Sequence, residues 1–162
     1  IDILGYYDKY LATLASISII SDIMPLKSFN RNLLKTIFKE YRDGEFLPIS
    51  LLADHENLSE NLIGMKIAPR INAIGRMISD TSINKIIPFF TEDNEEYILT
   101  YYNFILSTNE ERKTLSKETA ESLVISPENK AVVECTNIKE GLISYYYFLK
   151  ILQIELSNND MK

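Results

Sequence analysis

The chain has 162 residues, enough for one domain with a buried core; 46% of them are hydrophobic and 25% are charged. This composition excludes a disordered chain, and no apolar run reaches the roughly 20 residues that a membrane-crossing helix needs. A single cysteine, Cys135, and a single histidine, His55, exclude an internal disulfide and a zinc finger within this chain. The lone cysteine also fits a reducing compartment, so we expect a cytoplasmic protein.

The net charge of −6 argues against nonspecific binding of nucleic acid, but the charge is unevenly distributed. Residues 27–42 contain one acid, Glu40, and five basic side chains: Lys27, Arg31, Lys35, Lys39 and Arg42. Residues 62–87 contain one acid, Asp80, and four basic side chains: Lys66, Arg70, Arg76 and Lys85. A local basic surface on an acidic protein is therefore an open alternative.

The first half of the chain has helical patterns. Residues 9–24 are apolar and rich in small side chains, which predicts a helix ending before Pro25, with a buried strand as the alternative. Residues 30–42 place apolar side chains at helical spacing, and a short helix is expected around residues 49–54. Asn57, followed by a glutamate three residues later, is predicted to cap the next helix.

The clearest predicted element is a long helix over residues 92–125, with Thr91 as its N-cap and Pro127 just beyond its end. Its apolar spacing fades in the second half, which is typical of a helix that bridges two packed bodies. A short buried strand is predicted at residues 130–136, followed by a final helix or strand–helix mixture at 142–156.

The segment KIAPRINAIGRM, residues 66–77, is basic and apolar at once. Pro69 disfavours helix at the residue before it and predicts a turn, from which Arg70 and Arg76 would project close together. Two guanidinium forks on a stiff turn are suited to clamping phosphate, with Asn72 supporting the turn. The alternative is that both arginines pair with acids of the protein itself.

Three segments together resemble RecJ, the single-strand-specific 5′→3′ DNA exonuclease of the DHH phosphoesterase superfamily. Residues 63–77, IGMKIAPRINAIGRM, resemble the family's APRINAxGR signature. Residues 15–26, ASISIISDIMPL, followed by Asn30-Arg31, resemble its segment of the form GTvaDvvPL…eNR. Residues 79–96 and 107–113 resemble the entry into its long connecting helix. The matches keep the family's order and rough spacing over residues 11–115.

The resemblance implies an α/β family fold of which this segment is mostly α-helical. Residues 1–90 would be the C-terminal part of a DHH domain, 91–126 the connecting helix, and 127–162 the start of a DHH-associated domain with a short strand. The expected substrate is single-stranded DNA, hydrolysed from its 5′ end with two Mn²⁺ or Mg²⁺ ions. A single-strand-binding protein or a helicase is a candidate partner, and no membrane contact is expected.

The resemblance also assigns roles to particular residues. Asp22 matches a catalytic aspartate that binds the metal ions, and Arg70, Asn72 and Arg76 match the turn that contacts DNA phosphates. Two further residues, Arg31 and Lys66, are candidate DNA contacts.

Other features depart from the family. The DxD and DHH motifs that supply most of the family's metal ligands are absent from this chain, so we expect no complete active site in it. The pair Asp54-His55 has only one histidine and lies C-terminal to Asp22, whereas the family's DHH motif lies N-terminal to it. We therefore expect His55 to be solvated. Residues 136–144 have Lys139 and Ser144 where the family has His and Gly.

The chain is therefore interpreted as an interior segment of a RecJ-like nuclease. Three alternatives stay open: a single-strand-binding or scaffold relative that has lost the metal site, a DHH phosphodiesterase acting on short oligonucleotides or cyclic dinucleotides, and a helical partner-binding piece.

Overall fold

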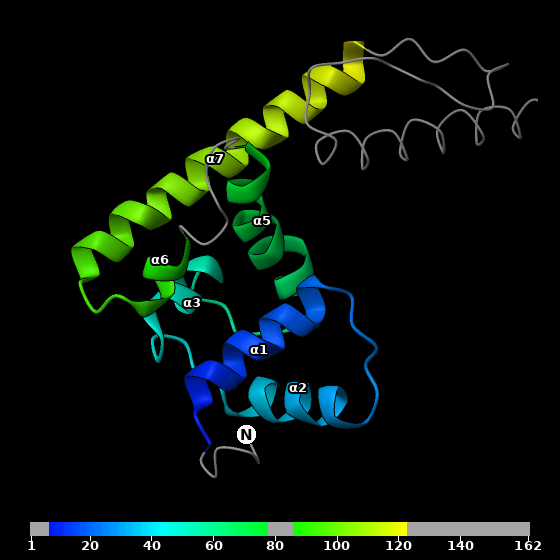
Figure 1. The fold of residues 1–162 in the computed structure, drawn as a ribbon, viewed down its shortest axis with the longest axis vertical. Helices are drawn as coiled ribbons and strands as arrows, with labels where there is room; N and C mark the ends of the chain where they lie inside the picture. The colour runs from blue at the N-terminus through cyan, green and yellow to red at the C-terminus, as the bar shows by residue number, and fades with distance from the viewer. Residues whose placement is uncertain (1–6, 78–85, 123–162) are drawn as a thin grey trace, which may run out of the picture.

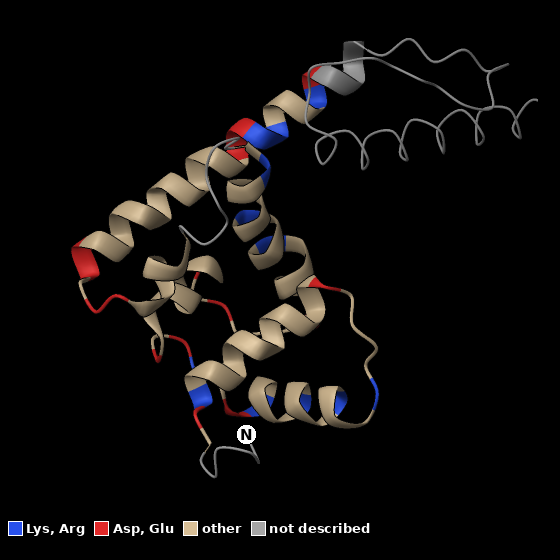
Figure 2. Cartoon of the chain, viewed as in Figure 1, with Lys and Arg blue, Asp and Glu red and all other residues tan. Residues whose placement is uncertain are grey.

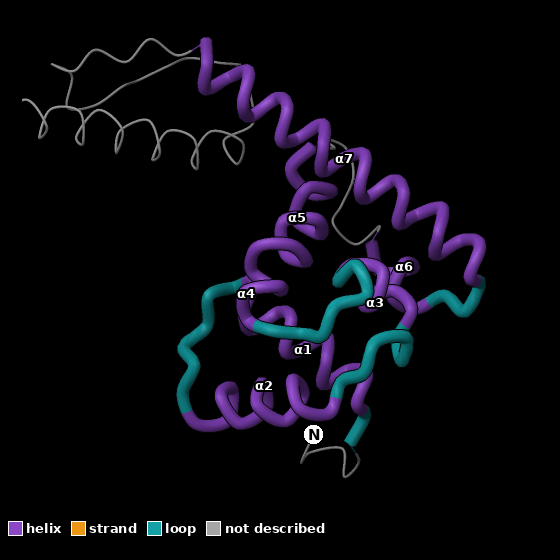
Figure 3. The backbone as a smooth tube through the Cα atoms, turned by 180° about the vertical axis from the view of Figure 1, so that it is seen from behind, coloured by secondary structure: helices purple, strands orange, loops and turns teal. Residues whose placement is uncertain are grey.

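The computed structural model describes residues 7–77 and 86–122 (Figure 1). Every regular element in these two ranges is helical, which confirms the mostly α-helical prediction, and no strand occurs among the described residues (Figure 3). The elements are α1 (Lys9–Ser21), α2 (Ser28–Glu40), α3 (Leu47–Leu52), α4 (Glu60–Leu62), the π-helical turn η1 (Ile63–Ile67), α5 (Ala68–Met77), α6 (Ile87–Thr91) and α7 (Glu95–Ser122). The segments predicted at 130–136 and 142–156 lie outside the described residues.

α1 is a helix, so the alternative of a buried strand is wrong. Asp8 caps it by accepting a 3.0 Å hydrogen bond from the amide of Leu11. The buried hydroxyl of Ser16 donates to the Ala12 carbonyl at 2.9 Å, so the polar side chain is satisfied within the helix. The helix ends at Ser21, three residues earlier than predicted.

α2 packs against α1 through one face, as its apolar spacing predicted. Leu33, Leu34 and Ile37 are buried on that face. Tyr41, directly after the helix, is 1% exposed, and its hydroxyl lies 2.9 Å from that of Ser50 in α3. A buried tyrosine needs such a partner, so this contact joins α2 to the next element.

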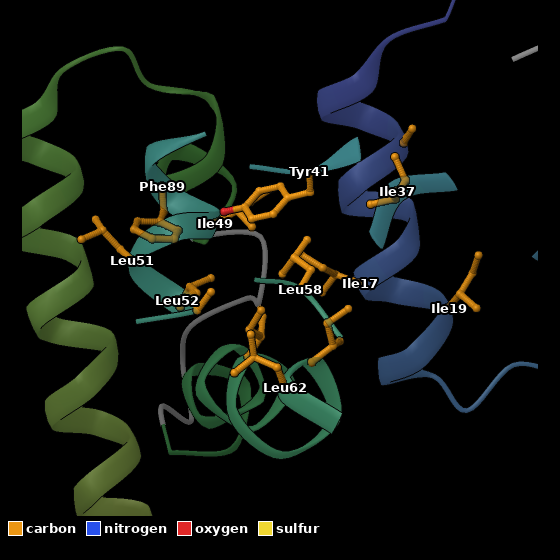
Figure 4. Packing of buried hydrophobic residues seen from close by; sticks show 14 of the residues in the cluster. Ile17, Ile19, Ile37, Tyr41, Ile49, Leu51, Leu52, Leu58, Leu62 and Phe89 are labelled. Carbon is orange, nitrogen blue, oxygen red and sulfur yellow. The ribbon is translucent and has the colours of Figure 1, made fainter. Parts of the chain in front are cut away.

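The core draws on all the described helices, α1 to α7 with η1 (Figure 4). Its largest fully buried hydrophobic side chains are Tyr41, Phe89, Ile37, Ile49, Leu52, Ile63, Ile67, Ile74 and Ile105. Burying such side chains is the main stabilising contribution to a small helical body.

The turn predicted at Pro69 does not form. Ala68 is helical, with φ −59° and ψ −44°, and α4, η1 and α5 run on without a break from Glu60 to Met77. The amide of Ala68 donates to the Ile63 carbonyl, five residues back, so the chain winds wider just before Pro69. This π-helical turn accommodates a proline that would otherwise break a regular helix. The cap predicted at Asn57 is also wrong, because Ser59 accepts from the amide of Leu62 at 3.1 Å.

α7 is the longest described helix, and it begins at Glu95. Thr91, the predicted N-cap of this helix, is instead the last residue of α6. Asn94 caps α7 by accepting a 3.0 Å bond from the amide of Tyr97. α5, α3 and α6 pack against its first half, where Ile98 and Ile105 are buried. Its far end extends beyond the other described helices (Figures 1 and 3). None of the helices in the described ranges has the length and apolar character needed to span a bilayer.

Candidate nucleic-acid interface

Asp54 is bound by three side chains that come from different helices. Arg70 of α5 places Nη1 2.8 Å from Oδ1 and Nη2 2.9 Å from Oδ2, a two-pronged pairing. The hydroxyl of Tyr102 in α7 donates to Oδ1 at 2.9 Å, and Nζ of Lys66 in η1 lies 3.1 Å from Oδ2. Asp54, Lys66, Arg70 and Tyr102 are called the Asp54 cluster below.

The backbone after α3 presents this carboxylate. Asp54 has a φ of +51°, in the left-handed region that aspartate tolerates better than most residues. Arg70 donates a further 2.7 Å bond to the Leu52 carbonyl, which α3 leaves unpaired at its C-terminal end. The Arg70 side chain is only 14% exposed, so its fork is committed to these two acceptors.

The cluster also shifts the acidity of its members. The two bonds from Arg70, assisted by those from Lys66 and Tyr102, hold the pKa of Asp54 far below its usual range. Burial raises the pKa of the Tyr102 hydroxyl, and its bond to Asp54 raises it further. The pKa of Lys66 is raised by Glu56 and then by Asp54. At neutral pH Asp54 and Lys66 are therefore charged, while the Tyr102 hydroxyl keeps its proton and donates it to the carboxylate.

The structure separates the residues that the sequence grouped as a phosphate clamp. Arg70 pairs with an internal acid, which was the alternative expectation, so the predicted pair of free forks does not form. Because α5 is a regular helix, Arg70 and Arg76 point about 120° apart around its axis. Asn72 and Arg76 are four residues apart, so they share one face, and both are exposed. The exposed polar face of α5 therefore consists of Asn72 and Arg76.

Asp22 is the C-cap of α1 and is exposed, and its Oδ2 accepts a 3.1 Å bond from the Ser18 hydroxyl. The end of α1 lies beside η1, where a Cβ added to Gly64 would be 3.8 Å from Ile20. Asp22 is thus close to the start of the helix that carries Arg70 and Arg76. Arg76 lies about 18 Å further along that helix than Gly64.

The residues described here do not complete a metal site. In the ranges 7–77 and 86–122 no three His, Cys, Asp or Glu side chains come together in a way that could hold an ion. A catalytic two-metal site needs several carboxylates or histidines, and Asp22 supplies one.

The other candidate contacts lie apart from one another. Arg31 is exposed on α2, whereas Lys66 is engaged by Asp54 and Glu56 within the Asp54 cluster. His55 is exposed, as expected for a solvated side chain, and its Nδ1 lies 3.2 Å from Asp43.

Sequence reasoning missed Asp54 as the partner of Arg70 and Tyr102 as a further donor to Asp54. Asp54 was considered only as part of the Asp54-His55 pair, and Tyr102 lies 48 residues away from it in the chain. One local pattern could have indicated the pairing: Asp54 is an acid at the end of a short apolar helix, where its carboxylate can bind an arginine from a later helix.

No protein-family model matches this chain, and no characterised protein matches it in sequence. Among solved structures, the chain is similar to the crystal structure of the exonuclease RecJ bound to manganese, with a TM-score of 0.73 and 24% identity. The match covers 96% of this chain and 41% of that one, so the chain spans less than half the length of the RecJ structure. This likeness establishes a RecJ-like fold, in agreement with the resemblance of the three sequence motifs.

Proposed function

We propose that this chain is a segment of a RecJ-like exonuclease, and that the complete protein hydrolyses phosphodiester bonds of single-stranded DNA from the 5′ end. The observation that carries the proposal is the match of 96% of the chain to the RecJ structure at a TM-score of 0.73. The order of the three motifs over residues 11–115 supports it independently. The proposed domains are the C-terminal part of a DHH domain at residues 1–90, a connecting helix at 91–126, and the start of a DHH-associated domain at 127–162.

Within this segment, Asn72 and Arg76 are the proposed contacts to DNA phosphates. They share the exposed polar face of α5, and an arginine fork matches phosphate geometry. Arg70 would reach a phosphate only by releasing Asp54, so its proposed role is to fix α5 in place unless DNA binding displaces that carboxylate. Lys66 would likewise have to release Asp54 before it could contact a phosphate.

Asp22 is the proposed ligand to Mn²⁺ or Mg²⁺, and the metal ions would supply activated water and charge stabilisation in the complete enzyme. Because the described residues do not complete such a site, no hydrolytic step is derived from them. The remaining ligands would come from other parts of the protein.

Binding and cleavage of a labelled 20-nucleotide thymidine oligomer test the proposal. We expect the purified chain to bind the oligomer in a salt-dependent manner and Arg76→Ala to weaken binding, while Lys113→Ala, which removes an exposed cation paired with Glu110, leaves it unchanged. Equal binding by Arg76→Ala and the unaltered chain would contradict the assignment of the α5 face.

Cleavage is tested with the same oligomer, labelled at its 5′ end, and Mn²⁺. We expect no products from the 162-residue chain. Products that disappear in Asp22→Ala would show that the chain holds a complete site and overturn this part of the proposal.

The alternative of a non-catalytic single-strand-binding relative rests on one observation: among residues 7–77 and 86–122, no three His, Cys, Asp or Glu side chains are grouped so that they could hold a metal ion. Reading the coding sequence before Ile1 separates the two. DxD and DHH motifs there support the nuclease, and their absence supports the binding relative.

A further inference from the structure

The exposed face of α2 carries a row of basic side chains. Lys27, Arg31, Lys35 and Lys39 follow one another at intervals of four residues, beginning at the N-cap of the helix. Four residues of helix advance about 6 Å along the axis and about 40° around it, so the row forms a shallow spiral on one side. All four residues are exposed; the buried side chains Leu33 and Ile37 occupy the opposite side, and buried Leu34 lies at the edge of the row. Figure 2 shows the basic positions recurring along α2. These four residues are called the α2 row.

The α2 row differs from the other described cations because its side chains have neither a hydrogen bond nor an ion pair. Within residues 7–77 and 86–122, the lysine and arginine side chains without a hydrogen bond or ion pair are those of the α2 row, whereas Lys9 pairs with Glu45 at 2.6 Å and Lys113 with Glu110 at 2.7 Å. An ordinary solvated helix face intersperses both signs and gains from pairs four residues apart. Like charges at that spacing repel each other, so the α2 row destabilises the helix.

The surface beside the row is apolar. A hollow of about 350 Å³ is lined by Leu26, Arg31, Leu34, Lys35, Phe38 and Glu60. Phe38, which lines the hollow, is seven residues after Arg31 and therefore lies on the same side of α2. Cations that follow a backbone next to aromatic and apolar side chains that receive bases are the recurring pattern of single-strand binding. Glu60 is the one acid that lines this hollow among the described residues.

We propose that the α2 row and its hollow form a second anchoring surface for single-stranded nucleic acid, separate from the exposed face of α5. α1 lies between α2 and the helix that carries Arg76, so the two surfaces belong to different parts of the body (Figure 1). The cations of the α2 row neutralise successive phosphates, and the hollow with Phe38 takes the face of a base. This inference goes beyond the proposed function, because it holds for a binding relative as well as for a nuclease.

The test compares two matched double variants of the full chain. Lys35→Gln/Lys39→Gln removes two cations four residues apart on α2, and Lys113→Gln/Lys117→Gln removes two cations at the same spacing on α7. Fluorescence anisotropy with a 20-nucleotide thymidine oligomer is recorded from 50 to 200 mM salt. We expect the α2 variant to lose about tenfold in affinity at low salt and about 1.4 from the slope of log K against log salt. The α7 variant should match the unaltered chain.

Two further measurements identify the ligand. Phe38→Leu, which keeps an apolar side chain in the hollow and removes its ring, should weaken binding of the oligomer without changing the salt slope, because stacking is not electrostatic. Glu60→Gln should strengthen it. Poly-glutamate of equal charge should compete poorly, and equal competition by poly-glutamate would overturn nucleic acid in favour of an acidic protein partner.

The proposal is overturned if the α2 and α7 variants bind equally while circular dichroism shows both folded. It also fails if a 20-base-pair duplex binds more tightly than the oligomer and Phe38→Leu has no effect. A failure here leaves the proposed function intact, because that proposal is tested by Arg76→Ala and by the coding sequence before Ile1.

Discussion

The Asp54 cluster and the α2 row contain the same kinds of residue in opposite situations. In the cluster, Arg70 and Lys66 converge on one carboxylate, and the Arg70 side chain is 14% exposed. On α2, four cations stand exposed with no acid among the described residues within bonding distance. A sequence that is basic in both places therefore has two different physical outcomes. The first region joins helices together, and the second is available to an anion from outside.

The largest expected effect comes from breaking the cluster at Arg70. Arg70→Ala removes two bonds to Asp54 and leaves the Leu52 carbonyl unpaired, so we expect unfolding to become easier by about 2 kcal/mol. Urea titration followed by circular dichroism measures this. Lys35→Ala on α2 is the matched control and should change stability by less than about 0.5 kcal/mol. A loss of equal size in both variants would erase the distinction between the two regions.

The stability that the Asp54 cluster contributes should depend on pH, and replacing Asp54 by a neutral residue tests this. The pKa of Asp54 is lower in the folded than in the unfolded chain, where it is about 3.9, so its stabilising contribution is present above pH 4 and lost as pH falls further. We expect Asp54→Asn to destabilise by about 1 kcal/mol at pH 7, a figure reduced for the exposure of the carboxylate. The difference from the unaltered chain should narrow between pH 4 and pH 2. Asp43→Asn, at an exposed carboxylate beside His55, serves as the control.

Tyr102→Phe tests the smallest contact of the cluster. It keeps the ring and deletes the 2.9 Å bond to Asp54, so we expect a loss of about 0.5–1 kcal/mol. Tyr97→Phe, at a more exposed position of the same helix, should lie within about 0.3 kcal/mol of the unaltered chain. Combining Tyr102→Phe with Arg70→Ala should give less than the sum of the two losses, because both act on one carboxylate.

The smallest effect, and the one of opposite sign, is expected on α2. Lys35→Gln/Lys39→Gln relieves repulsion between cations four residues apart and should stabilise the chain by about 0.2–0.5 kcal/mol at low salt. Thermal unfolding at 20 mM and 500 mM salt measures it, and the gain should vanish at the higher concentration because exposed charges are screened. Destabilisation by this variant would indicate that the two lysines have internal partners after all.

Local sequence patterns predicted the helices α2, α3 and α7, because apolar spacing and chain breakers act over a few residues. They failed at Pro69, where the general effect of proline predicted a turn. The π-helical turn of residues 63–67 accommodates that proline, and this depends on how η1 packs against α1. Caps were also misassigned by a few residues, to Thr91 and Asn57 instead of Asn94 and Ser59.

By itself, the sequence determined the helical character of the described chain, the basic content of residues 27–42, and the motif order that resembles RecJ. Tertiary structure alone decided which cations are neutralised. Asp54 and Arg70 are 16 residues apart, and Tyr102 is 48 residues from Asp54, so no local pattern relates them. An ion pair forms only where folding brings a carboxylate within a few ångströms of a cation. Folding does this at Arg70, whereas the four cations of the α2 row have no carboxylate so placed among the described residues.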